Sequence, residues 1–242
     1  MDLELLKQRA FIIQTVRNFF IENNFLELDT PALAKNLIPE TCLEIFKTEY
    51  LEPWSNKKHE LYLVPSSEVH IKPIIAQHKV DVFQLSKCYR NVESVGKTHS
   101  SEFTMLEWYK MNANYISNIE ETENLFRFLD KKLKQKMGFG LAQDLKPPFL
   151  KLSVNDAFKN YAGFELFHTT SSESSSQIAI SDLSKQARRL SILEPDDNKF
   201  ENWTWEELYN AIFVQCVEPN LPKEKCVFLM DYPSEVRCLA QN

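Results

Sequence analysis

Glycine is scarce in this chain, with four residues among 242. An average usage of about 7% would give roughly 17. The sequence has neither a Walker loop nor a GxGxxG segment, the glycine-rich loops whose backbone amides cradle phosphates. A nucleotide would therefore have to be bound by side chains on a sheet.

Excess positive charge, paired cysteines and long apolar runs are also lacking. The net charge of −6 gives no overall basic field to capture nucleic acid, although a local basic groove stays open. Five scattered cysteines without a CxxC are typical of reduced thiols in a cytoplasmic protein, rather than of disulfides or a zinc site. They are Cys42, Cys88, Cys216, Cys226 and Cys238. Without a signal peptide or a membrane-spanning run, secretion and membrane insertion are not expected.

The segment from Val82 to about Met111 is the most informative stretch. It predicts a hairpin with a strand ending at Tyr89, a polar loop containing Gly96, and a second strand from Glu102. Along the second strand, alternation puts four side chains on one face. They are Phe103, Met105, Glu107 and Tyr109.

This face offers different chemistry at its two ends. At about 3.3 Å per residue, Phe103 and Glu107 lie roughly 13 Å apart, the span from a nucleotide base to the side-chain tip of an attached amino acid. The Phe103 ring is suited to stack a base, Arg90 to neutralise a phosphate, and Glu107 with the Tyr109 hydroxyl to bind a cation. From the residues alone, an ordinary half-buried hairpin with solvated charges remains an alternative.

The segment before the hairpin predicts two helices. The spacing of Leu6, Ala10, Ile13, Val16 and Phe20 predicts an amphipathic helix over the first twenty-odd residues. Asn23 and Asn24 then offer a left-handed stop, and a strand closed by Pro31 follows.

A second helix is expected after a short strand ending near Pro65. Ser66 is a plausible N-cap for a helix starting with Ser67 and Glu68, interrupted by Pro73. A carboxylate in the first helical turn stays ionised, as binding an ammonium group requires. Complementing the helix end is the other role open to Glu68.

The C-terminal half predicts further helices and one strand. A capping box at Ser117 and Glu120 predicts a helix over 118–137, and another at Thr204 and Glu207 predicts one ending near Cys216. Short helices are expected over 154–161 and 181–190, a solvated, mobile low-complexity segment over 168–177, and a strand over 226–233.

Several of these segments resemble the class II lysyl-tRNA synthetase group. Tyr89-Arg90-Asn91, Glu93, Gly96, His99 and the run EFTMLEWY over 102–109 resemble motif 2 of that group. Residues 9–31 look like motif 1, and Ser66-Ser67-Glu68 looks like the start of the substrate-binding helix. Residues 217–233 look most like the elongation factor P lysine ligases, which modify a protein rather than a tRNA.

The resemblance implies a fold and a set of site residues. The fold would be α+β, a mostly antiparallel sheet flanked by helices, in a single domain over residues 1–242. The implied ATP-binding residues are Arg90, Asn91, Glu93, His99 and Phe103, with Arg90 also catalytic. Ser66, Glu68, Glu107 and Tyr109 would bind the amino acid. Motif 1 implies a homodimer through residues 3–31.

The implied reaction is ATP-dependent activation of lysine, or a β-lysine-like amino acid, as an adenylate. The acyl group would pass to an acceptor, for which a lysine of elongation factor P ranks first. A non-catalytic binding or regulatory paralogue is the alternative, and a lysine-tRNA ligase ranks third because nothing that would read an anticodon precedes motif 1.

The sequence departs from the family pattern in several places. Glu93 stands one residue later than in many members, and Ser101, Asn24 and Pro73 replace more usual residues. Family members continue past the region that ends here at Asn242, through motif 3 and the carboxylates that bind Mg²⁺. We therefore expect the magnesium ligands outside this chain, and activation by the chain alone to be very slow or absent.

Overall fold

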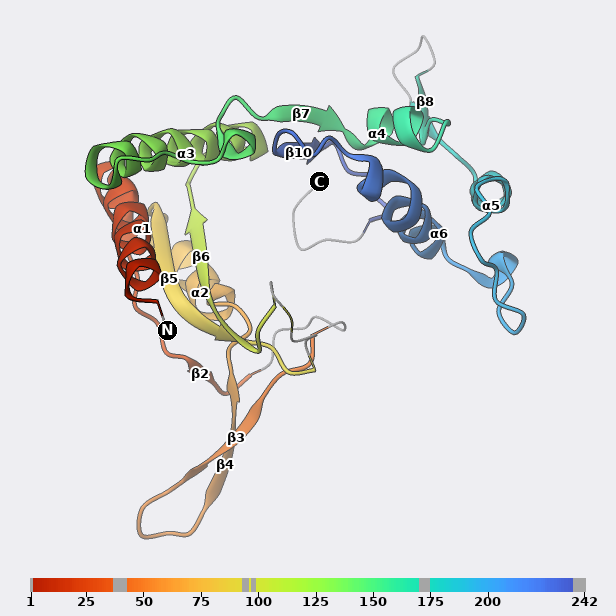
Figure 1. Ribbon diagram of the computed structural model, residues 1–242. Helices are drawn as coiled ribbons and strands as arrows, with labels where there is room; N and C mark the ends of the chain where they lie inside the picture. The colour runs from red at the N-terminus through yellow and green to blue at the C-terminus, as the bar shows by residue number, and fades with distance from the viewer. Residues whose placement is uncertain (1, 37–42, 93–95, 97–98, 170–174, 237–242) are drawn as a thin grey trace. The chain divides into compact units, whose positions relative to one another are not determined.

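The computed structural model describes residues 2–36, 43–92, 96, 99–169 and 175–236. The chain forms two compact units, Met1–Gly140 and Leu141–Asn242, which are treated separately below (Figure 1). The fold is α+β, as expected. That one domain covers residues 1–242 stays a prediction.

The first unit contains three helices and six strands among its described residues. In chain order they are α1 (Leu3–Glu22), β1 (Leu26–Glu27), β2 (Leu33–Ala34), β3 (Lys47–Leu51), β4 (Lys58–Leu63), α2 (Glu68–His78), β5 (Val82–Tyr89), β6 (Glu102–Tyr109) and α3 (Tyr115–Met137).

In the second unit, α-helices alternate with short strands and single helical turns. The order is η1 (Gln143–Leu145), β7 (Leu150–Ser153), α4 (Val154–Tyr161), β8 (Phe167–Thr169), β9 (Ser175–Gln177), α5 (Ile180–Arg189), η2 (Phe200–Asn202), α6 (Trp205–Ile212), the π-helix η3 (Phe213–Val217), η4 (Glu218–Asn220) and β10 (Val227–Met230).

The β5–β6 hairpin predicted from the sequence is confirmed. The two strands pair antiparallel along their whole length, from Val82 opposite Tyr109 to Tyr89 opposite Glu102. The short strand β1 pairs parallel with the start of β5, giving the sheet order β1-β5-β6. Because residues directly opposite each other share a face, Phe83 and Trp108 lie on one face of the hairpin, and Gln84 and Glu107 on the other.

Helix α1 covers the aromatic face of this hairpin. Phe20 is fully buried; its ring stacks on Phe83 at 4.9 Å between centroids and lies 5.6 Å from Trp108. Near the start of the helix, Arg9 Nη2 donates to Thr104 Oγ1 at 2.9 Å. The helix ends as predicted, with Asn24 in the left-handed region at φ 64°. The opposite face of the hairpin is thus left for α2 and the predicted site.

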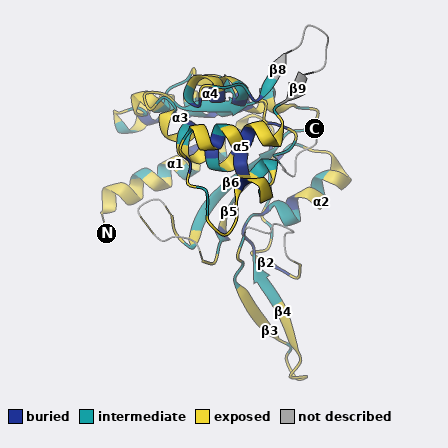
Figure 2. Cartoon of the chain, turned by 90° about the vertical axis from the view of Figure 1, so that its right-hand side faces the viewer, coloured by how far each residue is buried: buried dark blue, intermediate teal, exposed yellow. Residues whose placement is uncertain are grey.

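Strands β2, β4 and β3 form a second antiparallel sheet. Its β3–β4 part is a ribbon that projects away from the rest of the unit and is largely exposed (Figures 1 and 2).

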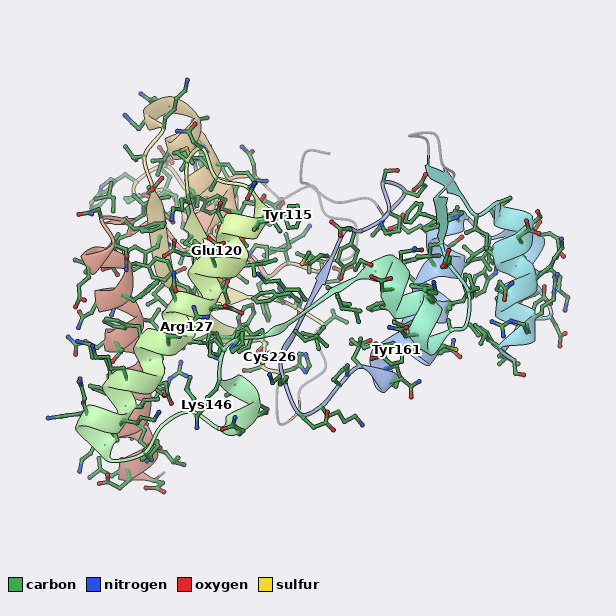
Figure 3. The ribbon with its side chains drawn as sticks, turned by 90° about the horizontal axis from the view of Figure 1, so that it is seen from above. Tyr115, Glu120, Arg127, Lys146, Tyr161 and Cys226 are labelled. Atoms are coloured by element: carbon green, nitrogen blue, oxygen red, sulfur yellow. The ribbon has the colours of Figure 1, made fainter. Side chains whose placement is uncertain are left out.

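The start of helix α3 corrects the predicted capping box. The N-cap is Asn114, whose side chain accepts a hydrogen bond from Ser117 N at 3.0 Å, so the helix begins three residues before residue 118. Asparagine and serine are both good N-caps, and the earlier one lets Tyr115 join the helix. Tyr115, Glu120 and Arg127 mark its course in Figure 3. The helix ends at Met137, as predicted, and its C-cap Gly138 has a φ of 76°.

The second unit is built around an aromatic core. The ring of Phe158 on α4 stacks on Tyr209 of α6 at 5.2 Å, and Tyr209 also stacks on Trp205 and Phe213. The predicted helices over 154–161 and 181–190 are confirmed within one residue. The capping box of Thr204 and Glu207 is present, and β10 pairs parallel with β7.

Part of the low-complexity segment is more ordered than expected. Strands β8 and β9 pair antiparallel, from Phe167 opposite Gln177 to Thr169 opposite Ser175. Pairing of backbone amides needs no apolar alternation in the sequence, so the Ser/Thr-rich composition concealed it. The predicted mobility of residues 170–174 lies outside the described residues.

Candidate functional site

The two ends of the β5–β6 hairpin carry the groups that the sequence placed there. At one end, Arg90 directly follows β5 and Phe103 is the second residue of β6. The Arg90 guanidinium lies over the Phe103 ring, 5.3 Å from its centroid. The structure therefore brings these two predicted ATP-binding residues together.

The Arg90 side chain has a buried atom that nothing satisfies. Its Nε is buried without a hydrogen-bond partner. No ion pair involves Arg90 among the described residues. A guanidinium is always charged and binds phosphate or carboxylate groups with paired N–H donors. A half-buried arginine without a carboxylate partner is suited to bind an anion.

At the other end, Glu107 is held by the start of α2. Ser66 Oγ donates to Glu107 Oε1 at 2.9 Å, and Ser67 N donates to Oε2 at 2.8 Å. The Ser67 hydroxyl donates to the same Oε2. A carboxylate offers about four acceptor positions, and these three donors use three of them.

Tyr109 lies beside this carboxylate. Its hydroxyl donates to Glu107 Oε1 across 3.4 Å, a long contact. Burial raises the pKa of Tyr109 well above its ordinary value, and the negative charges of Glu107 and Glu68 raise it further. The phenol therefore stays protonated. The structure thus brings together all four residues predicted to bind the amino acid, which are Ser66, Glu68, Glu107 and Tyr109.

Glu68 lies in the first turn of α2. Its carboxylate pairs with Lys72, one turn along the helix, and its side chain is 23% exposed. The ion pair occupies the carboxylate predicted to bind an α-amino group, so a substrate ammonium would compete with the half-exposed Lys72 side chain. The sequence prediction missed Lys72, although its i,i+4 spacing from Glu68 is a usual signal of a helical ion pair.

The structure corrects the predicted N-cap of α2. The N-cap is Ser67 rather than Ser66, and its side chain bonds to Glu107 instead of the helix. The hydroxyl of Ser66 still accepts from Glu68 N at 3.1 Å. Helix α2 continues through Pro73 to His78, so the expected interruption is absent.

The loop residues of the predicted ATP site are less well defined. Asn91 is exposed; it bridges to Glu44 through the backbone, and its side chain accepts from Val92 N at 3.0 Å. His99 is exposed, and its carbonyl accepts from Gly96 N at 3.1 Å. Glu93 lies outside the described residues. Their roles toward ATP stay predictions.

One buried side chain on this face was missed. Gln84 is directly opposite Glu107, is 2% exposed, and has its Oε1 buried without a partner. It also lines a cavity of about 310 Å³. A glutamine within an apolar strand was the available signal, because a buried polar residue needs partners.

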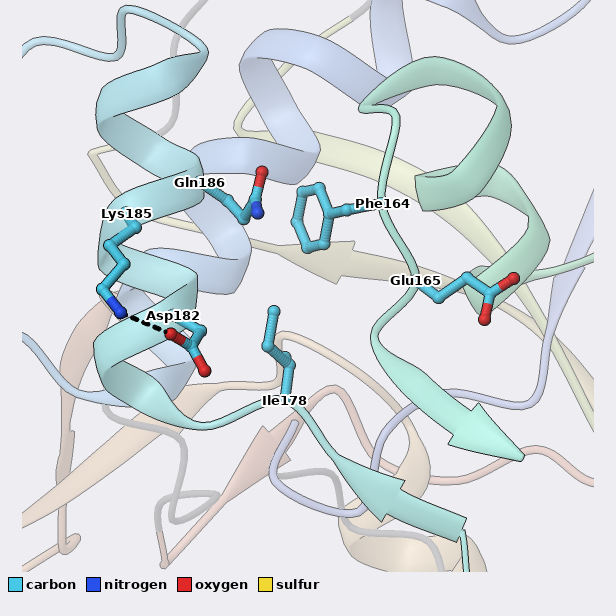
Figure 4. Close-up of a pocket in the computed structure, with 6 residues that line it drawn as sticks. All are labelled: Phe164, Glu165, Ile178, Asp182, Lys185 and Gln186. Atoms are coloured by element: carbon cyan, nitrogen blue, oxygen red, sulfur yellow. Dashed lines mark hydrogen bonds and ion pairs between the residues drawn. The ribbon is translucent and has the colours of Figure 1, made fainter. Parts of the chain in front are cut away.

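The second unit has a pocket of its own, of about 350 Å³ (Figure 4). Phe164 and Ile178 supply its apolar part, and Asp182, Lys185 and Gln186 come from α5. The carboxylates at its rim are already paired, Asp182 with Lys185 at 2.8 Å and Glu165 with Lys159 at 2.6 Å. The pocket therefore offers little unpaired charge to a ligand.

Neither a metal cluster nor a membrane helix was found in the described part of the chain. No three or more His, Cys, Asp or Glu residues gather there as metal ligands would. None of the helices described is both long and apolar enough to cross a membrane. Cys88, Cys216 and Cys226 are free thiols, as predicted.

Comparison with known proteins decides the family. A family profile described as "tRNA synthetases class II (D, K and N)" matches residues 3–242. The chain belongs to this family. The motif 2 resemblance of the hairpin is thereby confirmed at the level of the family, while the individual residue roles remain to be tested.

Curated relatives of this class II synthetase chain include several named elongation factor P–(R)-β-lysine ligase. The protein from Haemophilus influenzae (strain PittGG) is 32% identical over 240 residues, which cover 99% of this chain and 65% of that protein. The relative from Vibrio cholerae is 30% identical, with 99% and 66% covered, and that from Buchnera aphidicola is 31% identical, with 97% and 64% covered. The chain thus spans about two thirds of their length.

Proposed function

We propose that this chain activates lysine, or a β-lysine-like amino acid, as an aminoacyl-adenylate in the cytoplasm. The acyl group then passes to a lysine of elongation factor P, as the names of the relatives suggest. One observation carries the proposal. A single hairpin presents Arg90, which has no ion pair among the described residues, at one end and the Glu107 carboxylate at the other.

Each end suits one part of an adenylate. Arg90 is assigned to the α-phosphate and Phe103 to the adenine ring, with Asn91, Glu93 and His99 around the nucleotide. Glu68 is assigned to the α-amino group, and Glu107 with Tyr109 to the side-chain ammonium. Ser66 holds Glu107 in place at 2.9 Å. A cationic amino acid is favoured because no ion pair neutralises Glu107 among the described residues, whereas Glu68 pairs with Lys72.

The reaction needs no protein nucleophile. The carboxylate of the amino acid attacks the α-phosphorus of ATP, a new oxygen–phosphorus bond forms, and pyrophosphate leaves. The acceptor amine then attacks the acyl carbonyl, AMP leaves, and the amine loses a proton. The side chains contribute by positioning the reactants and neutralising charge.

Magnesium is the cation that this family generally uses with ATP. The described residues provide no cluster of carboxylates to hold it. The described side chains of this chain therefore do not form a binding site for Mg²⁺.

A homodimer through residues 3–31 is part of the proposal. Helix α1 exposes apolar side chains along much of its length; they are Leu3, Leu5, Leu6, Ile12 and Ile21. Burying them against a second copy would remove apolar surface from water. Light scattering at micromolar concentration tests this, and a monodisperse monomer would exclude it.

Calorimetry and isotope exchange together test the main proposal. The chain is titrated with lysine, β-lysine and a non-hydrolysable lysyl-adenylate analogue, and lysine-dependent exchange of pyrophosphate into ATP is then measured. Lysine binding with very slow or no exchange is the expected result for the chain alone. Robust exchange that Arg90→Ala abolishes would show that other residues complete the site, and no binding of any probe would overturn the proposal.

A further inference from the structure

Gln84 lies on the same face of the hairpin as Glu107 and borders the candidate amino-acid site. It lies in the middle of β5, directly opposite Glu107 in the strand register. Its Nε2 donates to Thr30 Oγ1 at 3.0 Å, which fixes the amide. Its Oε1 is buried and accepts no hydrogen bond. A strong acceptor is thus left open next to the carboxylate proposed to bind an ammonium group.

The cavity that Gln84 lines has the chemistry of a site for a cationic donor. Its volume is about 310 Å³, and its walls include Thr30, Pro31 and Val64. Asp29 adds a carboxylate at the exposed rim. Lys87 is the one cation among the lining residues, and it pairs with Glu102 at 2.9 Å. The free groups are therefore acceptors, and a donor with positive charge would satisfy them.

A primary ammonium group can reach two acceptors at once. It carries three N–H donors, and cross-strand neighbours on one face have their β-carbons about 5 Å apart. Glu107 accepts from Ser66 and Ser67 and, across a long contact of 3.4 Å, from the Tyr109 hydroxyl, whose position an ammonium group would share or replace. Gln84 offers its free carbonyl oxygen. An ammonium group between Glu107 and Gln84 would donate a hydrogen bond to each of them.

We infer that Gln84 is a specificity-determining residue whose Oε1 accepts a hydrogen bond from the side-chain ammonium of the amino-acid substrate. This inference rests on the proposed function, because it assumes that a lysine-like amino acid binds at Glu107. A substrate with an uncharged aliphatic side chain leaves the buried oxygen unsatisfied and is rejected. Gln84 thus adds a second reason for the preference for a cation, independent of the charge on Glu107.

The test compares lysine with norleucine, which has the same carbon chain without the ammonium group. Dissociation constants are measured by competition calorimetry for the wild-type chain, Gln84→Met and Thr30→Val. Gln84→Met removes the free acceptor and the bond to Thr30, whereas Thr30→Val removes that bond alone. We expect Gln84→Met to reduce the preference for lysine over norleucine about tenfold, the usual value of a hydrogen bond to a charged group. Thr30→Val should lower the melting temperature similarly but keep the preference within about twofold.

The outcomes separate this inference from the proposed function. If the wild-type chain binds no lysine, the proposed function fails. If Glu107→Gln weakens lysine binding but Gln84→Met leaves the preference unchanged, the inference alone fails, and water is the ordinary partner of Gln84. If Gln84→Met and Thr30→Val lose the preference for lysine over norleucine to the same extent, the inference is also overturned. If Gln84→Met does not fold, Gln84→Glu replaces it. A carboxylate there should raise the preference for lysine at least about threefold at pH 8, and no change would refute the inference.

Discussion

Among the described residues, four buried side-chain atoms of the unit Met1–Gly140 lack a hydrogen-bond partner, whereas one such atom is found in the unit Leu141–Asn242. The first four are His70 Nε2, Gln84 Oε1, Arg90 Nε and Trp108 Nε1, and the fifth is the Tyr209 hydroxyl. Each such atom costs about 1–3 kcal/mol when no partner exists. Three of the four, in Gln84, Arg90 and Trp108, belong to the hairpin that carries the candidate site.

The second unit uses its side chains differently. Aromatic rings from α4, α6 and η3 stack in its core, and Arg188 bridges Glu194 and Glu201 at its surface. The contrast indicates that the first unit leaves groups open for a ligand, and that the second satisfies its groups internally. Mutations in the second unit should therefore change stability, and mutations on the hairpin should change binding.

The largest effect is expected from Phe158→Ala in the second unit. Phe158 is fully buried and stacks on Tyr209 at 5.2 Å, so truncation leaves a cavity and removes a stacked pair. The free energy of unfolding should fall by about 3–5 kcal/mol. Urea unfolding followed by circular dichroism measures it. Leu193→Ala is the matched control, because Leu193 is 84% exposed, and its change should stay within about 0.5 kcal/mol. A loss below about 1 kcal/mol for Phe158→Ala would contradict this view of the core.

Glu107→Gln tests the expectation that mutations on the hairpin change binding. It removes the charge assigned to the substrate ammonium and should weaken lysine binding by about 1.5–3 kcal/mol, roughly ten- to a hundredfold. ATP affinity should change less. Both are measured by calorimetry.

Ser67→Ala serves as the control for Glu107→Gln. It removes one donor to Glu107 Oε2 and leaves the carboxylate charged. Lysine affinity should therefore stay closer to that of the wild type. If Ser67→Ala were as damaging as Glu107→Gln, the carboxylate would serve mainly to anchor α2.

The strands and helices of the hairpin unit could be predicted because their signals are local. Alternation along 102–109 and the position of Gly138 both follow from neighbouring residues. The contact between Ser67 and Glu107 joins residues 40 apart in the chain, and no periodicity reveals it. The same applies to the Gln84–Thr30 bond, which joins residues 54 apart. The candidate site was therefore predicted as a set of residues, without its internal hydrogen bonds.

Errors at helix starts have a different cause. Asn114 and Ser117 are both good N-cap residues, as are Ser66 and Ser67, and local sequence gives no reason to prefer one of each pair. Tertiary contacts decide instead. Ser67 turns its hydroxyl toward Glu107, which a sequence pattern does not show.

A smaller effect is expected from Thr204→Ala at the start of α6. Thr204 accepts from Glu207 N at 3.2 Å, and Glu207 accepts from Thr204 N at 2.7 Å. Losing this cap should cost about 1 kcal/mol in the free energy of unfolding, measured by urea. Thr204→Ser keeps the hydroxyl and should restore most of it. Equal losses for alanine and serine would show that the hydroxyl is not the stabilising group.

The smallest effect is expected from Glu194→Gln and should appear through its pH dependence. Hydrogen bonds from Arg188 and from Phe200 N lower the pKa of Glu194 from its ordinary value of 4.5 to about 2. A carboxyl group with a lowered pKa in the folded state stabilises the fold above its unfolded pKa and loses this contribution as the pH falls. The contribution of Glu194 should therefore be complete above about pH 4.5 and decline toward pH 2.

Glutamine can still accept from Phe200 N but carries no charge, so the melting temperature of Glu194→Gln should lie slightly below that of the wild type at pH 7. The two should converge as the pH approaches 2, and added salt should narrow the gap at pH 7, because exposed ion pairs are screened. A difference that is the same at pH 2.5 and pH 7 would mean that the charge of Glu194 contributes nothing, and that the second unit is held by its aromatic core and its caps.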